Sequence, residues 1–129
     1  MTEPPSERPE TVRVVVADDD PDIRVLLQSI LDLDQRIEVT GVAVDGGDAL
    51  AQFEAQRPEV LVVDERMPVL YGLEVAEQVL RDHPEQIVIL CTAFVDDTVI
   101  SAASGLGVRS VLGKGEIHRL GDEIIRLVG

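Results

Sequence analysis

Five short runs of mostly β-branched and other apolar residues recur along the chain, and an amphipathic stretch follows each of them. The runs span residues 12–17, 37–44, 60–64, 86–91 and 108–113. Near-continuous apolar runs of this length are typical of strands that are buried on both faces. Strands that alternate with helices form a mainly parallel sheet with helices on both faces and right-handed crossovers. The sequence therefore predicts a doubly wound α/β fold.

Each intervening helix is predicted from apolar residues spaced three and four positions apart. The first helix begins after Asp20, a favourable N-cap, with Pro21 in its first turn. The fourth helix, after residue 97, is expected to be short and weak, and the final helix is expected to run over 117–128. The positions expected to face the core are Ile23, Leu26, Leu27, Ile30, Leu31, Ala49, Leu50, Phe53, Leu73, Ala76, Val79, Leu80, Val99, Ile100, Ala103, Ile117, Leu120, Ile124, Leu127 and Val128.

The chain has the length of one domain, with 129 residues and a mass of 14.0 kDa. Residues 1–11 carry prolines and charges but no apolar run, which predicts a disordered tail before a single domain over 12–129. A net charge of −14 argues against nucleic acid or anionic lipid as a direct partner. No apolar stretch is long enough to span a membrane, and the single cysteine, Cys91, fits the reducing cytoplasm.

Ligands of open α/β sheets bind beyond the carboxyl ends of the strands. Two of these ends carry acids: Asp18, Asp19 and Asp20 follow the first predicted strand, and Asp64 follows the third. Carboxylates that meet at one edge repel each other, and a hard cation such as Mg²⁺ relieves the repulsion. The simpler alternative is that one acid caps a helix and the others are solvated, and Asp20 is the best candidate for the cap.

A hydroxyl and an ammonium group end the fourth and fifth strands. Thr92 could donate a hydrogen bond to a bound anion, although ordinary β propensity also explains it. Lys114 is the only lysine among the 11 basic residues, and its alternative is a solvated charge. Acids, a metal ion, a hydroxyl and an ammonium around one aspartate suit phosphoryl transfer to that aspartate. The two histidines, His83 and His118, have no partner at metal-ligand spacing and are expected at the surface.

Four motifs in order resemble those of response-regulator receiver domains over about residues 12–128: VRVVVADDDPDIRVLL, VLVVDERMPVLYGLEV, IVILCTAF and VRSVLGKG. The resemblance implies a flavodoxin-like sheet of strand order 2-1-3-4-5 and a place in a two-component system. It implies a sensor histidine kinase or phosphotransfer protein as phosphoryl donor. It also implies an output protein or a second copy bound through the fourth helix, fifth strand and fifth helix. Self-phosphorylation and autodephosphorylation are the only reactions expected.

The resemblance also implies a role for each residue at this edge. Asp64 is the phosphoacceptor. The implied Mg²⁺ ligands are Asp18, Asp19, Asp64 and the backbone carbonyl of Arg66, with Asp18 binding directly or through water. The residues implied to contact the phosphoryl oxygens are Thr92 and Lys114.

Some positions depart from the pattern of this family. Val111 stands three residues before the lysine, where the family usually has a Tyr or Phe that moves with the switch threonine. Gly115 follows the lysine in place of the common Pro or Asp. Phe94 and Arg66 lie two residues after the threonine and the phosphoacceptor, at positions that tune the access of water to the acyl phosphate. A bulky Phe beside a long Arg predicts a long-lived phosphoryl group.

Other interpretations stay open at this point. The segment RIEVTGVAVDGGDAL also resembles receivers that precede a LuxR-type helix-turn-helix, so a chain ending at Gly129 fits a separate receiver or part of a longer DNA-binding regulator. A receiver-like interaction module that is not phosphorylated would fit Val111. A phosphatase of the haloacid-dehalogenase type would need its nucleophile at 18–20 and normally a cap domain. A flavodoxin-type carrier fits less well because the first loop is acidic.

Overall fold

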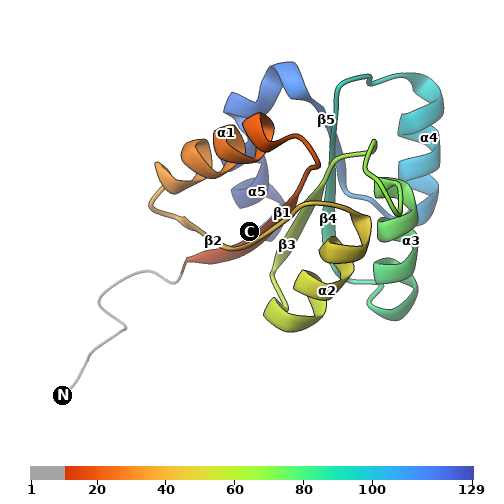
Figure 1. Cartoon of the computed structure of the whole chain (residues 1–129), viewed down its shortest axis with the longest axis horizontal. Helices are drawn as coiled ribbons and strands as arrows, with labels where there is room; N and C mark the ends of the chain where they lie inside the picture. The colour runs from red at the N-terminus through yellow and green to blue at the C-terminus, as the bar shows by residue number, and fades with distance from the viewer. Residues whose placement is uncertain (1–10) are drawn as a thin grey trace.

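The computed structural model describes residues 11–129 and has five strands, five α-helices and a 3-10 helix (Figure 1). The strands are β1 (Val12–Ala17), β2 (Ile37–Ala43), β3 (Val60–Val63), β4 (Ile87–Thr92) and β5 (Ser110–Gly113). The helices are α1 (Pro21–Asp32), α2 (Gly46–Gln56), α3 (Gly72–Asp82), α4 (Asp97–Leu106), η2 (Lys114–Arg119) and α5 (Leu120–Val128). The predicted tail over 1–11 lies outside the described residues except for Thr11.

All strand pairs are parallel, and the sheet order is β2-β1-β3-β4-β5, as predicted. The chain leaves β1 toward β2 on one side and returns to β3 on the other, so strand order reverses around β1. Ala17, the last residue of β1, pairs with Ala43 on one side and with Val63 on the other. The residues that follow β1 and β3 therefore emerge side by side, where open α/β sheets bind ligands.

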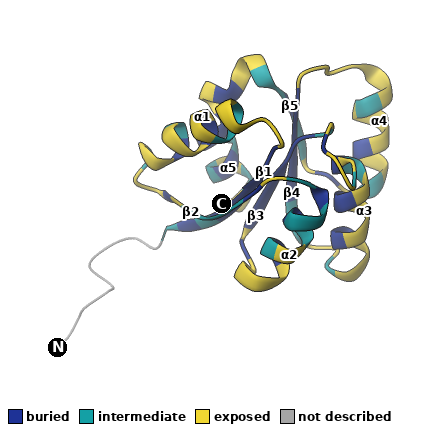
Figure 2. Ribbon diagram, viewed as in Figure 1, coloured by how far each residue is buried: buried dark blue, intermediate teal, exposed yellow. Residues whose placement is uncertain are grey.

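The sheet is buried on both faces because alternate residues of each strand point to opposite sides. Helices α1 and α5 cover one face, and α2, α3 and α4 cover the other (Figure 1). In β1, Val14 and Val16 pack with the α1 and α5 side, whereas Val15 and Ala17 pack with the α2 and α3 side. The central strands are accordingly buried along their length (Figure 2). These two apolar layers fix the sheet that carries the polar residues at its edge.

Three aspartates cap helices at their N-termini, which assigns a structural role to part of the negative charge. Asp20 accepts a hydrogen bond from the Asp22 amide at 2.9 Å, as predicted. Asp45 and Asp96 cap α2 and α4 in the same way. Such caps satisfy amides that have no partner inside the helix and complement the helix dipole.

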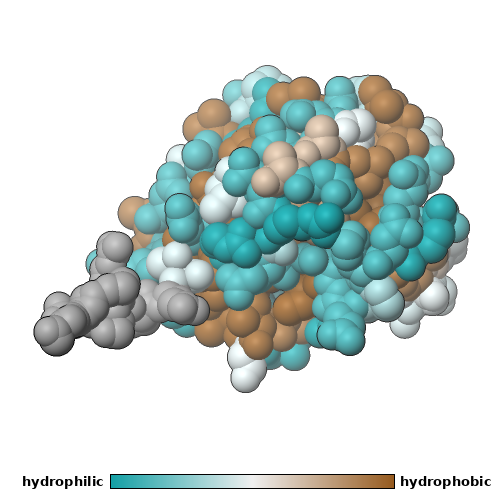
Figure 3. Space-filling model, turned by 90° about the horizontal axis from the view of Figure 1, so that it is seen from below, coloured by the Kyte–Doolittle hydropathy of each residue, from teal (hydrophilic) through white to brown (hydrophobic). Residues whose placement is uncertain are grey.

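Seen from below, hydrophilic residues cross the middle of the surface between hydrophobic ones (Figure 3).

The structure corrects three expectations about the helices. Residues 114–119 form η2, so α5 begins at Leu120 and not at residue 117; within η2, Glu116 leaves the helical region with φ −115° and ψ 22°. Leu26, Ile100 and Val128 were expected to face the core but are 44 %, 43 % and 37 % exposed, since the buried stripe of each helix is narrower than its apolar pattern. Helix α4 has ten residues and is not short, but Ala103 is its only buried residue.

Within residues 11–129, no helix combines the length and apolar character that crossing a membrane requires.

Candidate functional site

The register of the sheet brings Asp18 and Asp64 together. Each directly follows a member of the Ala17–Val63 pair, and the Asp64 amide donates to the Ala17 carbonyl at 3.0 Å. The Asp18 amide donates to the carbonyl of Ala43 at 3.1 Å. Both side chains are buried, with Asp18 1 % and Asp64 3 % exposed. Backbone pairing therefore holds two acidic side chains in the interior at the ends of neighbouring strands.

Asp19 completes a cluster with these two acids. One carboxylate oxygen each from Asp18, Asp19 and Asp64 lies within 4.8 Å of the others. Asp19 is exposed, so the cluster opens to solvent on its side. Hard carboxylate oxygens at this spacing fit Mg²⁺, which binds oxygen ligands and retains several waters. The donor set in the structure thus matches the metal that the sequence predicts.

Lys114 lies between the two buried acids. Its Nζ is 2.9 Å from Asp18 Oδ2 and 3.2 Å from Asp64 Oδ2. Burial opposes the charge of Lys114, but hydrogen bonds and charges from both aspartates outweigh it and raise the lysine pKa. Burial and the nearby Asp18 charge raise the pKa of Asp64, and Lys114 offsets part of that rise. The ammonium thus supports the ionised form of a carboxylate that burial disfavours.

Asp18 is the most constrained of the three acids. Its Oδ1 accepts from the Asp20 amide at 2.9 Å, while its Oδ2 faces Lys114. Its carbonyl accepts from Arg24 Nη1 at 2.8 Å. The sequence did not single out Arg24, although a residue in the first turns of α1 can reach back toward the loop before the helix. Because both Asp18 oxygens already have partners, the exposed Asp19 is a more available metal ligand than Asp18.

Thr92 lies beside this cluster at the end of β4. It is 3 % exposed and pairs with Gly113, the residue before Lys114. It also lines a pocket of about 540 Å³ between the loops that follow β3 and β4. The other lining residues are Asp19, Glu65, Arg66, Met67, Pro68, Tyr71, Phe94, Asp96 and Val99. The five predicted side chains, Asp18, Asp19, Asp64, Thr92 and Lys114, therefore gather at one edge of the sheet.

Phe94 and Arg66 meet at the rim of this pocket. The Arg66 guanidinium carbon is 6.0 Å from the centre of the Phe94 ring, in a cation–π arrangement. Both residues line the pocket, and Phe94 is 69 % exposed. Val111, by contrast, pairs with Leu90 and packs against the α2 and α3 side of the core. Gly115 is exposed and has open space around it.

The loop from β3 to α3 is strained at Val69, whose φ is +74°. The Leu70 amide donates to the Pro68 carbonyl at 2.8 Å, which closes a tight turn around Val69. The Gly46 amide also donates to this carbonyl at 3.2 Å. Positive φ is unfavourable for a β-branched residue, so the surrounding contacts must hold this conformation.

Val69→Gly is expected to stabilise the fold by about 1 kcal/mol. Glycine removes strain of about 1–3 kcal/mol, and the greater freedom of the unfolded chain cancels about 1 kcal/mol of that gain. Chemical denaturation measures the free energy of unfolding. Val25→Gly is the control, because Val25 is 65 % exposed in α1 and glycine there should destabilise. A Val69→Gly protein less stable than the wild type would contradict the strain argument.

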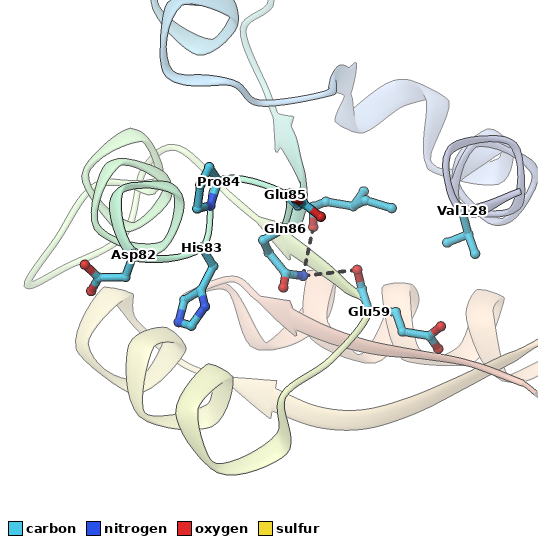
Figure 4. Close-up of a pocket in the computed structure, with 8 residues that line it drawn as sticks. Glu59, Asp82, His83, Pro84, Glu85, Gln86 and Val128 are labelled. Atoms are coloured by element: carbon cyan, nitrogen blue, oxygen red, sulfur yellow. Dashed lines mark hydrogen bonds between the residues drawn. The ribbon is translucent and has the colours of Figure 1, made fainter.

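A second pocket, of about 610 Å³, lies between the end of α3 and the end of α5 (Figure 4). Glu59, Asp82 and Glu85 make its lining acidic. The side-chain amide of Gln86 donates to the Glu59 carbonyl at 3.0 Å and to the Ile87 carbonyl at 3.3 Å. The Gln86 amide thus serves to join the start of β4 to the start of β3. Of the groups described above, Asp19 and Thr92 line the other pocket.

Known proteins place this arrangement in a family. The sequence model of the response regulator receiver domain matches residues 14–124. The signal receiver domain of NarL from Mycobacterium tuberculosis is 33% identical, with a TM-score of 0.82, over 92% of this chain and 98% of that one. A DNA-binding response regulator of the LuxR family from Staphylococcus aureus, 24% identical, has the same fold, with a TM-score of 0.86 over 92% of this chain and 99% of that one.

Curated relatives are longer than this chain. A protein-glutamate methylesterase/protein-glutamine glutaminase from Geobacillus kaustophilus is 38% identical over 81 residues, which are 63% of this chain and 23% of that protein. The chain spans about a quarter of the length of such relatives. The family match covers the whole sheet edge that carries the acids, the threonine and the lysine. The chain therefore belongs to the response regulator receiver domains of two-component systems.

Proposed function

We propose that Asp64 is the phosphoacceptor of this receiver domain and that a phosphohistidine of a sensor kinase or phosphotransfer protein is the donor. The observation that carries the proposal is the position of Lys114, whose ammonium lies within 3.2 Å of both Asp64 and Asp18 in a cluster that the exposed Asp19 opens to solvent. A buried carboxylate with an adjacent cation and an approach from solvent suits a nucleophile for phosphoryl transfer. We place the domain in the cytoplasm, where a free thiol such as Cys91 stays reduced.

Asp18, Asp19, Asp64 and the carbonyl of Arg66 are the residues that would hold Mg²⁺. When bound, the cation neutralises negative charge on the transferred group. Asp19 would bind directly, since it is exposed, and Asp18 would bind directly or through water. The charge of the acids attracts the cation, while Lys114 remains available for the phosphoryl group.

The transfer exchanges one bond to phosphorus for another. An oxygen of Asp64 forms the new P–O bond as the P–N bond to the donor imidazole breaks. The imidazole nitrogen keeps the electron pair and takes up a proton. Lys114 and Thr92 then contact two of the phosphoryl oxygens. Loss of the group follows when water attacks phosphorus and the bond to the Asp64 oxygen breaks, which releases inorganic phosphate and restores the carboxylate.

Incubation with a small acyl-phosphate donor and Mg²⁺, followed by intact mass measurement, tests the proposal. The wild type should gain one phosphoryl group, and Asp64→Asn should gain none. Asp20→Asn is the matched control: it removes a neighbouring charge, but asparagine also caps helices well, so this variant should still be labelled. An unlabelled wild type would overturn the proposal and favour a receiver-like interaction module that is not phosphorylated.

Replacing Phe94 with alanine is expected to shorten the lifetime of the phosphoryl group several-fold. Arg66 and Phe94 stack in the lining of the pocket that Asp19 and Thr92 also line, so removing the ring should give water easier access to the acyl phosphate. The rate of autodephosphorylation after donor removal measures the effect, and Arg66→Ala should act in the same direction. Val95→Ala, a change on the same loop outside the pocket lining, is the control and should leave the lifetime unchanged. An unchanged lifetime in Phe94→Ala would contradict the shielding role.

Phosphorylation is expected to shift the output face only in part. Thr92 would move toward the phosphoryl group, and α4 would shift with it, since Ala103 is the only buried residue of this helix. Two charge-assisted hydrogen bonds supply about 1.5–3 kcal/mol each, whereas conversion from 1:99 to 99:1 needs roughly 5.5 kcal/mol. Val111 stands where the family usually has an aromatic side chain that moves with the threonine, so this contribution is missing. NMR shifts of α4, β5 and α5 with a phosphoryl mimic should be intermediate, and complete conversion would contradict this expectation.

A further inference from the structure

Glu65, the residue directly after Asp64, holds the start of α3. Its side-chain Oε1 accepts from the Leu73 amide at 2.9 Å, and its carbonyl accepts from the Gly72 amide at 3.0 Å. These are the first two amides of α3, which have no partner inside the helix. Residue 65 therefore joins the end of the phosphoacceptor strand to the next helix twice, once through its backbone and once through its side chain.

The two contacts close the loop 66–71. This loop starts with Arg66, whose carbonyl is the proposed backbone ligand, and contains the strained Val69. The side chain of Glu65 is half-buried and lines the same pocket as Asp19. A loop under strain reaches other conformations when a tether is removed. The carboxylate of Glu65 is thus placed to decide how well ordered the Arg66 carbonyl is.

We propose that Glu65 is a positioning residue for the Mg²⁺ site, acting through its hydrogen bond to the Leu73 amide. The inference rests on the proposed function, because it takes the Arg66 carbonyl as a ligand. Without the hydrogen bond from the Leu73 amide to Glu65, part of the binding energy of Mg²⁺ must be used to order the loop 66–71. Mg²⁺ affinity should therefore fall, whereas the rate of phosphorylation at saturating Mg²⁺ should change little.

Two conservative variants separate the hydrogen bond from the charge. Glu65→Gln keeps an oxygen that can accept from Leu73 but loses the charge. Glu65→Asp keeps the charge but is one methylene too short to reach the amide. Calorimetric titration with Mg²⁺ should show about tenfold weaker binding for Glu65→Asp, the low end of the range for residues that orient metal ligands. Glu65→Gln should stay within threefold of the wild type. The reverse ranking of the two variants would overturn the proposal.

Asp48→Ala is the matched control for helix capping. Asp48 Oδ2 accepts from the Val44 amide at 3.0 Å at the start of α2, and neither residue belongs to the loop 66–71. Asp48→Ala should lower thermal stability as much as Glu65→Asp does and leave Mg²⁺ affinity unchanged; equal weakening by both variants would overturn the proposal. If the wild type binds Mg²⁺ but takes no phosphoryl group, only the proposal for Asp64 is refuted. If the wild type is phosphorylated and Glu65→Asp binds Mg²⁺ as tightly as the wild type, only the proposal for Glu65 is refuted.

Discussion

Lys114→Met is expected to slow the phosphorylation of Asp64 about a hundredfold at saturating Mg²⁺ and donor, the low end of the range for removing one preorganised donor. The ammonium contacts Asp64 Oδ2 at 3.2 Å, and among residues 11–129 it is the only cation that forms an ion pair with the acids of the cluster. Methionine keeps the length and apolar stem of the side chain but offers no charge to the phosphoryl oxygens. The rate of adduct formation, followed by mass, measures the effect.

Arg119→Met is the matched control for this prediction. Arg119 lies in the same helix η2 and is 63 % exposed, with Glu116 as its partner at 3.4 Å. The variant therefore changes the net charge of the chain by the same amount without altering the cluster. Its rate of phosphorylation should equal that of the wild type, because salt screens the charge of an exposed side chain. A Lys114→Met rate within threefold of the wild type would show that the lysine is not needed for transfer.

The sequence predicted the sheet because its signals are local. A short β-branched run such as VRVVVA favours a strand buried on both faces, and Asp20–Pro21 is a local signal for the start of a helix. The alternation of such signals leaves few topologies, and the observed strand order is the predicted one. The start of α5 was missed because the spacing of Ile117 and Leu120 does not distinguish a 3-10 turn from the first turn of an α-helix.

The acids of the site followed from the topology, whereas the contacts that hold them did not. Asp18 and Asp64 could be placed together once both were seen to follow buried strands. Arg24 and Glu65 act through backbone atoms, on the Asp18 carbonyl and the Leu73 amide respectively. Backbone partners have no residue-type signature, so only the folded geometry shows them. The reach of Lys114 across the end of β4 likewise depends on the three-dimensional path of the chain.

Gly72→Ala is expected to destabilise the fold by about 3 kcal/mol, the upper end of the usual cost of overpacking. A methyl group at Gly72 would lie 2.3 Å from the carbonyl oxygen of Asp64 and 2.9 Å from its carbonyl carbon. Backbone atoms cannot rotate away as a side chain can, so either α3 or the end of β3 must move. The free energy of unfolding from denaturant titration measures the cost.

The same displacement should also impair the site, because it moves the phosphoacceptor itself. Gly105→Ala is the matched control: Gly105 lies in α4 with nothing within 4 Å of the added methyl group. Alanine there should stabilise the protein by about 0.5–1 kcal/mol through its better helix propensity and leave labelling of Asp64 intact. Gly72→Ala should fall in both stability and labelling rate. Gly72→Ala could instead lose stability and still be labelled at the wild-type rate. That result would mean that α3 moves and Asp64 does not. The close approach of Gly72 would then stabilise the fold without setting the position of Asp64.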